Sequence, residues 1–409
     1  IHGCGSPEAI DAHLLELRKV LVLKRAIRHT DGAVYQHLKR FRHVESDGRF
    51  IRPNPAYVQE VVERLGLQNA EPAHAPLSEQ LRPVAEDSEE PLDEFWITEY
   101  RSLTCTLLYA SHDIAEVQYA LRFLTMDLKT PTVKSCERLE RVTKYLKAVR
   151  HEGVWYPADG KPDKLIVSTD SDWAGCKRSR KSTSCIVIQC GGCTLYTQSV
   201  GQSIHSQSSG EAEFYSAVSG VSAGLGLAHL LEFIGMPMKI ELQLDSSAAR
   251  GVLWRTGVGK IRHLEVKTLW VQDLVTAGRL TVKPVPGEQN VADIGTKVLS
   301  GERIEFLKGK INVKSINDLE VRLPVIAHLR QHVTAPAPTY LKRVCGIMTL
   351  MVQGTGGAAV AAYNLEPSVC RSEPGVPSTL NIPVIATLVF LLGLVLGTVC
   401  SYVWLREYY

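Results

Sequence analysis

Two aspartates, Asp170 and Asp172, close an apolar run in the stretch LIVSTDSDWAGCKRSRKSTS. Strand ends and turns are rich in Asp, Gly and Ser, so a surface turn explains this stretch alone equally well. A basic run follows at once, made of Lys177, Arg178, Arg180 and Lys181. Carboxylates beside such a run are the combination expected of a site that holds a cation and binds a polyanion.

Three more acidic residues stand at predicted element ends. Glu213 lies one turn into a long helix, Asp245 ends an apolar strand, and Asp293 lies in the first turn of the last helix. Strand C-termini and helix N-termini of an α/β sheet converge on one edge, where sites usually form. Each acid taken alone is more simply explained as a solvated turn or a helix cap. Their joint placement with Asp170 favours a common site.

Four carboxylates at one edge would repel one another unless cations were bound. Hard oxygen ligands left open to water and phosphates suit Mg²⁺, with Mn²⁺ as a substitute. Two such ions about 4 Å apart can activate a water and stabilise the leaving oxygen of a phosphodiester. We therefore expect catalysis and metal binding by Asp170, Glu213, Asp245 and Asp293.

The elements that would position these acids run from Lys164 to about residue 311. Strand patterns cover KLIVSTD, SCIVIQC and CTLYTQS, and the last two are joined as a hairpin about Gly191 and Gly192. Helices are predicted at SGEAEFYSAVSGVSAGLGLAHLLEFIG, SSAARGVLW, IRHLEVKTLWVQDLVTAG and EQNVADIGTKVL, with strands at KIELQLD and RLTVKPV. This order predicts a mixed sheet with helices on its faces.

The flanking regions differ from this part. Upstream, residues 8–150 carry helical and strand patterns interrupted by a Pro- and acid-rich linker at about residues 71–94. Downstream, residues 312–381 predict a second linker. Residues 382–405 form an uncharged apolar run that is long enough to cross a bilayer of about 30 Å, so we expect one transmembrane helix there.

The composition is that of a folded chain, with 409 residues, 45% of them hydrophobic and 22% charged. A formal net charge of +3 means that nucleic-acid binding would need local basic patches. The chain does not open on a start methionine or a secretory signal, so we expect an intracellular fragment of a longer polyprotein with reduced thiols.

Three other patterns have simpler explanations than a site. Cys190 and Cys193 have zinc-knuckle spacing, but no second ligand pair follows and a hairpin turn is the better interpretation. His205 and Ser208 lack the GxSxG elbow of a nucleophile pair. The Gly-rich VSGVSAGLG lies inside a predicted helix and lacks the strand–turn–helix context of a phosphate loop.

Several separated stretches occur in order within residues 164–311, as STDSDWAGCKRSRKSTS, SSGEAEFYSAVSG, LQLDSSAA and KIRHLEVKTLWVQDLVTAGRLTVKPVPGEQNVADIGTK. They resemble the ribonuclease H (RNase H) domain of copia-type LTR retrotransposon Pol polyproteins. Upstream, FIRPNPAYVQEVVERLGLQNAEPAHAPL and YRSLTCTLLYASHDIAEVQYALRFLTMDLKTPT are similar to the C-terminal part of the same elements' reverse transcriptase, so residues 8–150 would be a partial domain of that kind.

The resemblance implies an RNase H-like fold with a five-stranded mixed sheet that binds two Mg²⁺ ions. By motif position, the family's acids fall on Asp170, on Glu213 rather than Glu211, and on Asp245 and Asp293, with Asp172 as a neighbouring charge. Nucleic-acid contacts are expected from the basic run and from Ser246, Arg262 and His263.

The expected activity is hydrolysis of the RNA strand of RNA–DNA hybrids. No polymerase activity is expected, because the Y-x-D-D stretch of the reverse transcriptase does not occur. The expected partners are the hybrid, a membrane reached through the C-terminal helix, and the remainder of a retroelement polyprotein, with the nuclease in the cytosol. The alternative is an inactive remnant that serves as a tail-anchored nucleic-acid-binding or interaction protein, which would bind hybrids without turnover.

Overall fold

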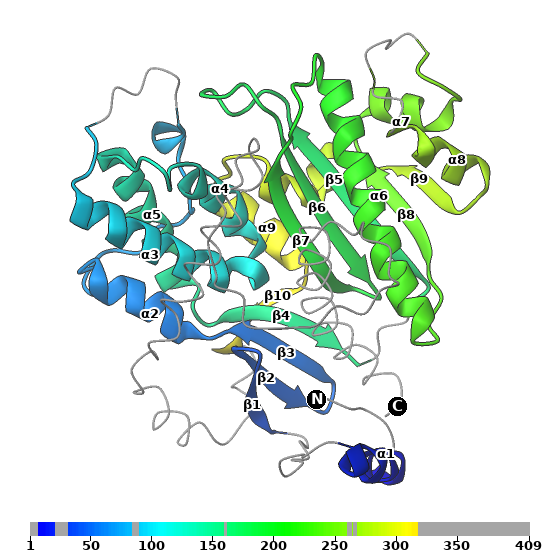
Figure 1. Ribbon diagram of the computed structural model, residues 1–409, viewed down its shortest axis with the longest axis horizontal. Coiled ribbons are helices and arrows are strands. Elements are labelled where there is room, and N and C mark those ends of the chain that lie inside the picture. Colours follow the sequence, from blue (N-terminus) through cyan, green and yellow to red (C-terminus); the bar gives the residue numbers. More distant parts are fainter. Residues whose placement is uncertain are drawn as a thin grey trace, which may run out of the picture.

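The computed structural model describes residues 7–20, 32–83, 90–158, 162–259, 264 and 268–317. Within these ranges the chain forms two five-stranded sheets and a group of helices beside them (Figure 1). The first sheet has the strand order β1-β2-β3-β4-β10, and the second has the order β7-β6-β5-β8-β9.

The second sheet is mixed, as predicted. Its strands are β5 (Lys164–Asp172), β6 (Thr183–Cys190), β7 (Cys193–Gly201), β8 (Lys239–Leu244) and β9 (Leu280–Pro284). Strand β5 pairs antiparallel with β6 and parallel with β8, and β8 pairs parallel with β9. The turn between β6 and β7 has φ of 55° at Gly191 and 79° at Gly192, a conformation that glycine adopts without strain. The parallel pairing puts the C-terminal ends of β5 and β8 on the same edge.

Helix α6 (Ser209–Phe233) crosses one face of this sheet and contacts β5, β6 and β8 (Figure 1). Its glycines permit the close approach, because an added Cβ at Gly220 would lie 2.5 Å from Cγ2 of Thr169. Among the helices that the structure describes, α6 is the one long and apolar enough to cross a membrane. Its buried side chains belong to the core over the sheet, which accounts for the apolar composition.

Shorter helices complete the second sheet's surroundings: α7 (Ser247–Trp254), α8 (Trp270–Thr276) and α9 (Gly301–Lys310). The predicted last helix is different in the structure. A 3-10 helix, η6 (Val291–Gly295), carries Asp293, and α9 begins only after Ser300. The reason is packing, since Asn290 anchors η6 by donating to the carbonyl of Thr169 at 3.0 Å.

The first sheet is antiparallel throughout. Its strands are β1 (Val34–His37), β2 (Arg40–Glu45), β3 (Gly48–Pro53), β4 (Glu152–Pro157) and β10 (Val313–Ser315). Strand β10 corrects the predicted linker of residues 312–381, because Val313 pairs with Val154 and Ile316 is buried against Phe50. The remainder of that linker, from residue 318, and the predicted transmembrane helix at 382–405 lie outside the described residues.

The upstream helices are α1 (Pro7–Val20), α2 (Pro55–Arg64), α3 (Glu94–Ala110), α4 (Gln118–Met126) and α5 (Val133–Ala148). Helices α2 to α5 share one hydrophobic core. The predicted linker at about 71–94 joins this core where it is described, because Ala75 and Leu77 are buried there. A reverse-transcriptase origin for this region remains a prediction.

Gly220→Ala should lower the free energy of unfolding by about 1–3 kcal/mol, because the new methyl group overlaps Thr169 in a packed interface. The matched control is Gly226→Ala on the exposed side of α6, where a Cβ meets no atom within 4 Å. That variant should gain up to about 1 kcal/mol from helix propensity. Urea unfolding measures both. Equal effects of the two variants would contradict the close contact between α6 and β5.

Candidate active site

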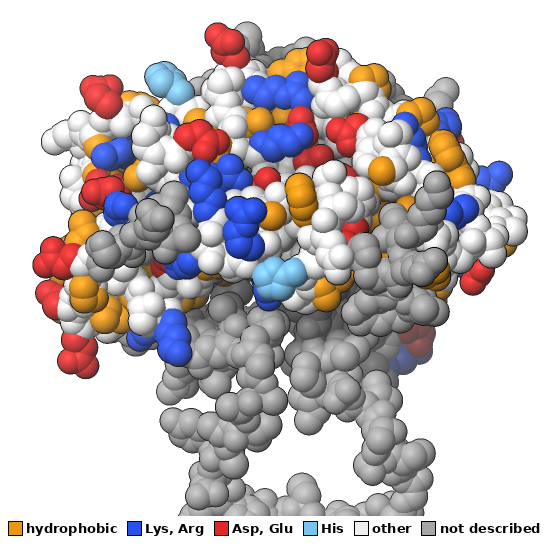
Figure 2. All heavy atoms as spheres, turned by 90° about the horizontal axis from the view of Figure 1, so that it is seen from above, with side chains coloured by type: hydrophobic (Ala, Val, Ile, Leu, Met, Phe, Trp, Pro, Cys, Tyr) orange, Lys and Arg blue, Asp and Glu red, His pale blue; other side chains and the backbone are white. Residues whose placement is uncertain are grey.

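Three carboxylates from three different elements meet at one edge of the second sheet. Asp170 ends β5, Glu213 lies in the second turn of α6, and Asp245 directly follows β8. Each offers an oxygen atom, and these oxygens all lie within 4.8 Å of one another. This edge is at the top of Figure 1 and faces the viewer in Figure 2, where acidic side chains lie among Lys and Arg side chains.

Hydrogen bonds hold two of these carboxylates in place. The backbone N–H of Ser171 donates to Oε1 of Glu213 at 3.1 Å, and the hydroxyl of Thr296 donates to Oδ2 of Asp170. Ser216, one turn after Glu213 on α6, donates to the carbonyl of Asp170 at 2.8 Å and so ties the helix to the strand. These hydrogen bonds therefore fix the positions of Asp170 and Glu213 in this cluster at the sheet edge.

The cluster is short of compensating charge. Burial raises the pKa of Asp170 to about 6, with Asp293 and Asp245 adding to the shift against the lowering effects of Lys297 and Thr296. Burial, followed by the charge of Asp170, raises the pKa of Glu213 to about 8. The negative charge of these groups is thus costly where they lie, and a bound cation would remove that cost.

The donor set fits a hard divalent cation. All three side chains are carboxylates, the ligand type that Mg²⁺ and Mn²⁺ prefer. Oε2 of Glu213 is buried and has no hydrogen-bond partner among the described residues. An unpartnered carboxylate oxygen is expensive to bury unless a ligand satisfies it. The residues present therefore match the divalent-metal use expected of an RNase H-like fold.

Asp293 lies beside this cluster but is held by cations of the chain itself. Lys297 contacts Oδ1 of Asp293, and Arg303 lies 3.1 Å from its Oδ2. The Lys297 ammonium also lies 3.6 Å from Oδ2 of Asp170. The structure thus gathers three of the four expected acids and places the fourth across Lys297 from Asp170.

The second aspartate of the opening pair faces the upstream helices. Oδ2 of Asp172 lies 2.6 Å from Nη2 of Arg82 and accepts a hydrogen bond from the hydroxyl of Tyr119 at 3.0 Å. Asp172 therefore links the second sheet to the upstream region, although its strand neighbour Asp170 belongs to the cluster.

The basic run after Asp172 divides in the structure. Arg178 forms an ion pair of 2.7 Å with Asp127, which is buried and also pairs with Arg138 at 2.9 Å. Lys177 and Arg180 are exposed and accessible to a polyanion, whereas Lys181 is half-buried.

Of the other residues expected to contact nucleic acid, the structure describes Ser246. Ser246 follows Asp245 directly and caps α7 by accepting from the N–H of Ala249 at 3.2 Å. Arg262 and His263 lie outside the described residues.

Three residues at this edge were not expected from the sequence: Thr296, Lys297 and Arg303. Only Lys297 left a usable signal, because its position four residues after Asp293 suits an ion pair on a helical turn. Arg303 comes from the next helix, and no local spacing indicates its contact with Asp293.

No family model matches the chain. The chain is 23% identical over 266 residues to the retrovirus-related Pol polyprotein from transposon TNT 1-94 of Nicotiana tabacum, covering 63% of this chain and 20% of that protein. It is 24% identical over 263 residues to that of transposon RE1 of Arabidopsis thaliana, covering 64% and 18%. The chain is thus similar to Pol polyproteins of plant transposons. The resemblance expected from its motifs is confirmed, and the chain spans about one fifth of the length of these curated relatives.

Solved structures similar to this chain include the N-terminal RNase H domain of rv2228c from Mycobacterium tuberculosis, fused to maltose-binding protein. It is 15% identical, with a TM-score of 0.24, and the match covers 36% of this chain and 97% of that one. LC11-RNase H1 in complex with an RNA/DNA hybrid is 22% identical, with a TM-score of 0.22, and the match covers 35% and 98%. The five-stranded mixed sheet expected from the resemblance is present as the second sheet.

Replacing Lys297 by Met should tighten Mn²⁺ binding by about tenfold, because the carboxylates lose a cation that lies 3.6 Å from Oδ2 of Asp170. Isothermal titration calorimetry on the full chain measures the dissociation constant. Lys283→Met is the matched control, since Lys283 pairs with Glu241 at 2.8 Å and contacts no carboxylate of the cluster. Unchanged or weaker Mn²⁺ binding in Lys297→Met would show that its charge does not act on the cluster.

Proposed function

We propose that this chain hydrolyses the RNA strand of RNA–DNA hybrids in a reaction that depends on divalent cations. The observation that carries the proposal is the convergence of Asp170, Glu213 and Asp245 within 4.8 Å at the C-terminal edge of an RNase H-like sheet. The sequence similarity of the chain to transposon Pol polyproteins supports the same assignment.

The chain's own residues have distinct roles in this proposal. Asp170, Glu213 and Asp245 would hold a divalent ion, while Thr296 and the Ser171 amide keep two of these carboxylates oriented. When bound, a divalent ion would supply polarisation of the phosphodiester and a water of lowered pKa. In the two-ion form of the reaction, Asp293 would join Asp170 in holding a second Mg²⁺ or Mn²⁺.

Substrate selection would rest on positive charge around the cluster and on the RNA strand itself. The exposed Lys177 and Arg180 lie on the turn after β5 and would contact backbone phosphates. The 2′-hydroxyl group distinguishes the RNA strand from DNA. Ser246, next to Asp245, would be close enough to the cluster to contact the strand that is cut.

The proposal also includes the domain organisation. Residues 8–150 would derive from the C-terminal part of a reverse transcriptase, residues 164–311 would form the nuclease, and residues 382–405 would anchor the chain in a membrane with the nuclease in the cytosol. These domain assignments do not depend on catalytic activity, so they would still hold if the chain did not cleave hybrids.

The test is cleavage of an RNA-labelled hybrid by the full chain, with Mg²⁺ or with EDTA. Mg²⁺ should produce cleavage that EDTA abolishes, and Asp170→Asn should reduce the rate by roughly a thousandfold because the cation site loses a charged ligand. Circular dichroism checks that the variant is folded.

A matched glutamate pair tests the choice of residue within the motif. Glu213→Gln should lose activity, whereas Glu211→Gln should retain it, because Glu211 accepts from the N–H of Gln207 at 2.7 Å outside the cluster. Mg²⁺-dependent cleavage that survives in Asp170→Asn would refute the assignment. Folded wild-type chain that binds hybrids without cleavage would instead indicate the inactive remnant.

A further inference from the structure

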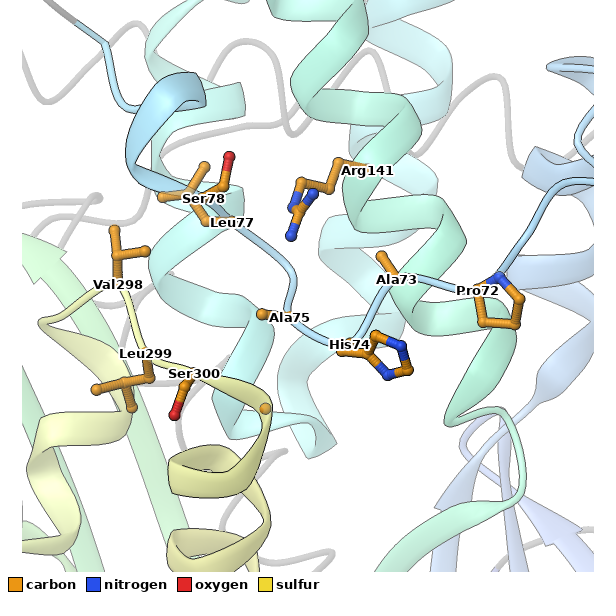
Figure 3. A pocket seen from close by; sticks show the side chains of 11 residues that line it. Pro72, Ala73, His74, Ala75, Leu77, Ser78, Arg141, Val298, Leu299 and Ser300 are labelled. Atoms are coloured by element: carbon orange, nitrogen blue, oxygen red, sulfur yellow. The ribbon is translucent and has the colours of Figure 1, made fainter.

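A cavity of about 490 Å³ lies where three segments distant in the sequence meet (Figure 3). Residues 72–78 form one wall, α5 contributes Arg141, and the segment 298–301 before and at the start of α9 forms the opposite wall. Apolar side chains make up most of the lining, and none of the lining residues is Asp or Glu. Among the described residues that line the cavity, the guanidinium of Arg141 therefore has no acidic counterpart.

Arg141 lines the cavity from α5 and points toward the segment of residues 72–78 (Figure 3). Its Nε is buried without a hydrogen-bond partner, and no ion pair joins Arg141 to another described residue. Arg138, one turn earlier on the same helix, is by contrast fully engaged with Asp127 and with the carbonyl of Leu81. A guanidinium carries five donors in a fork that matches phosphate or carboxylate, so an unpartnered one in a cavity favours an anionic ligand.

The opposite wall adds a second feature that favours negative charge, namely the N-terminus of helix α9. Helix α9 begins at Gly301, which lines the cavity, and Ser300 caps it by accepting from the N–H of Arg303 at 3.3 Å. The walls are in close contact, because a Cβ on Gly301 would lie 3.0 Å from the carbonyl oxygen of His74. The cavity is thus closed on that side by tightly packed backbone.

The cavity is also close to the candidate active site. Val298 lines it and directly follows Lys297, which contacts both Asp170 and Asp293. The three residue-to-residue steps from Lys297 to Ser300 span at most roughly 11 Å. Since one strand of a duplex carries a phosphate about every 3.4 Å along the helix axis, a strand at the cluster would have further phosphates within that reach.

We propose that this cavity binds a phosphate group through Arg141. This inference rests on the proposed hydrolase function. The phosphate belongs to the backbone of the nucleic-acid substrate, a few nucleotides from the bond that is cut. Arg141 then positions the strand from the upstream region, outside the nuclease part of the chain. A free phosphate is the other source of the same chemistry, and the experiment separates the two.

The first arm measures hybrid binding by the full chain in EDTA, using fluorescence anisotropy. Arg141→Gln should weaken binding by about tenfold, the range expected for loss of a charge-assisted hydrogen bond. It should also reduce the slope of log K against log salt by about 1. Lys144→Gln is the control, because it removes the same charge from the next turn of α5, where Lys144 pairs with Glu140 at 3.4 Å. That variant should bind within about twofold of wild type.

The second arm titrates inorganic phosphate into wild type and Arg141→Gln by calorimetry. Phosphate binding that is lost in the variant, with unchanged hybrid affinity, would keep the phosphate site and assign it to free phosphate. If the wild-type chain neither binds nor cuts hybrids, the proposed function fails and this arm alone decides the cavity. Equal binding of hybrid and of phosphate by Arg141→Gln and wild type would overturn the proposal.

Discussion

Repulsion among carboxylates buried at one sheet edge is the constraint on which the rest of the site depends. Parallel pairing of β5 and β8 brings Asp170 and Asp245 to the same edge, and α6 adds Glu213 from above the sheet. Proteins tolerate such an arrangement only with compensating donors or cations. The structure provides Thr296, the Ser171 amide and Lys297, yet one oxygen of Glu213 has no partner in the part of the chain that is described. That residual cost is the physical argument for a bound cation.

The upstream region is part of the same folded body as the second sheet. Arg82 forms an ion pair with Asp172, and Arg178 forms one with Asp127. Strand β10, which follows α9, pairs with β4. The turn after β5 therefore has two roles. Its Arg178 binds the upstream region through Asp127, and its exposed Lys177 and Arg180 are accessible to a nucleic acid.

Much of the second sheet follows from local sequence patterns. The apolar runs at β5, β6 and β8, the Gly191–Gly192 turn and the long helix α6 were all predicted in place. The convergence of Asp170, Glu213 and Asp245 follows from the same patterns, because strand ends and helix starts meet at one edge.

Features that depend on long-range packing could not be predicted in this way. The segment around Asp293 looks helical but forms a 3-10 turn, because Asn290 is anchored on β5. The pairing of β10 with β4 joins residues from opposite ends of the fold, and three residues are too few to stand out as a strand. The partner of Arg178 lies on another helix, so its charge alone suggested a free basic patch.

If the three carboxylates form a divalent-cation site, Mn²⁺ should bind between them. The most direct test is a crystal structure of the full chain with Mn²⁺, using anomalous scattering to locate the ions, beside the Asp170→Asn variant. We expect an anomalous peak bound by Asp170, Glu213 and Asp245 in the wild type, and its loss in the variant. Saturating Mn²⁺ with no peak at these carboxylates would contradict it.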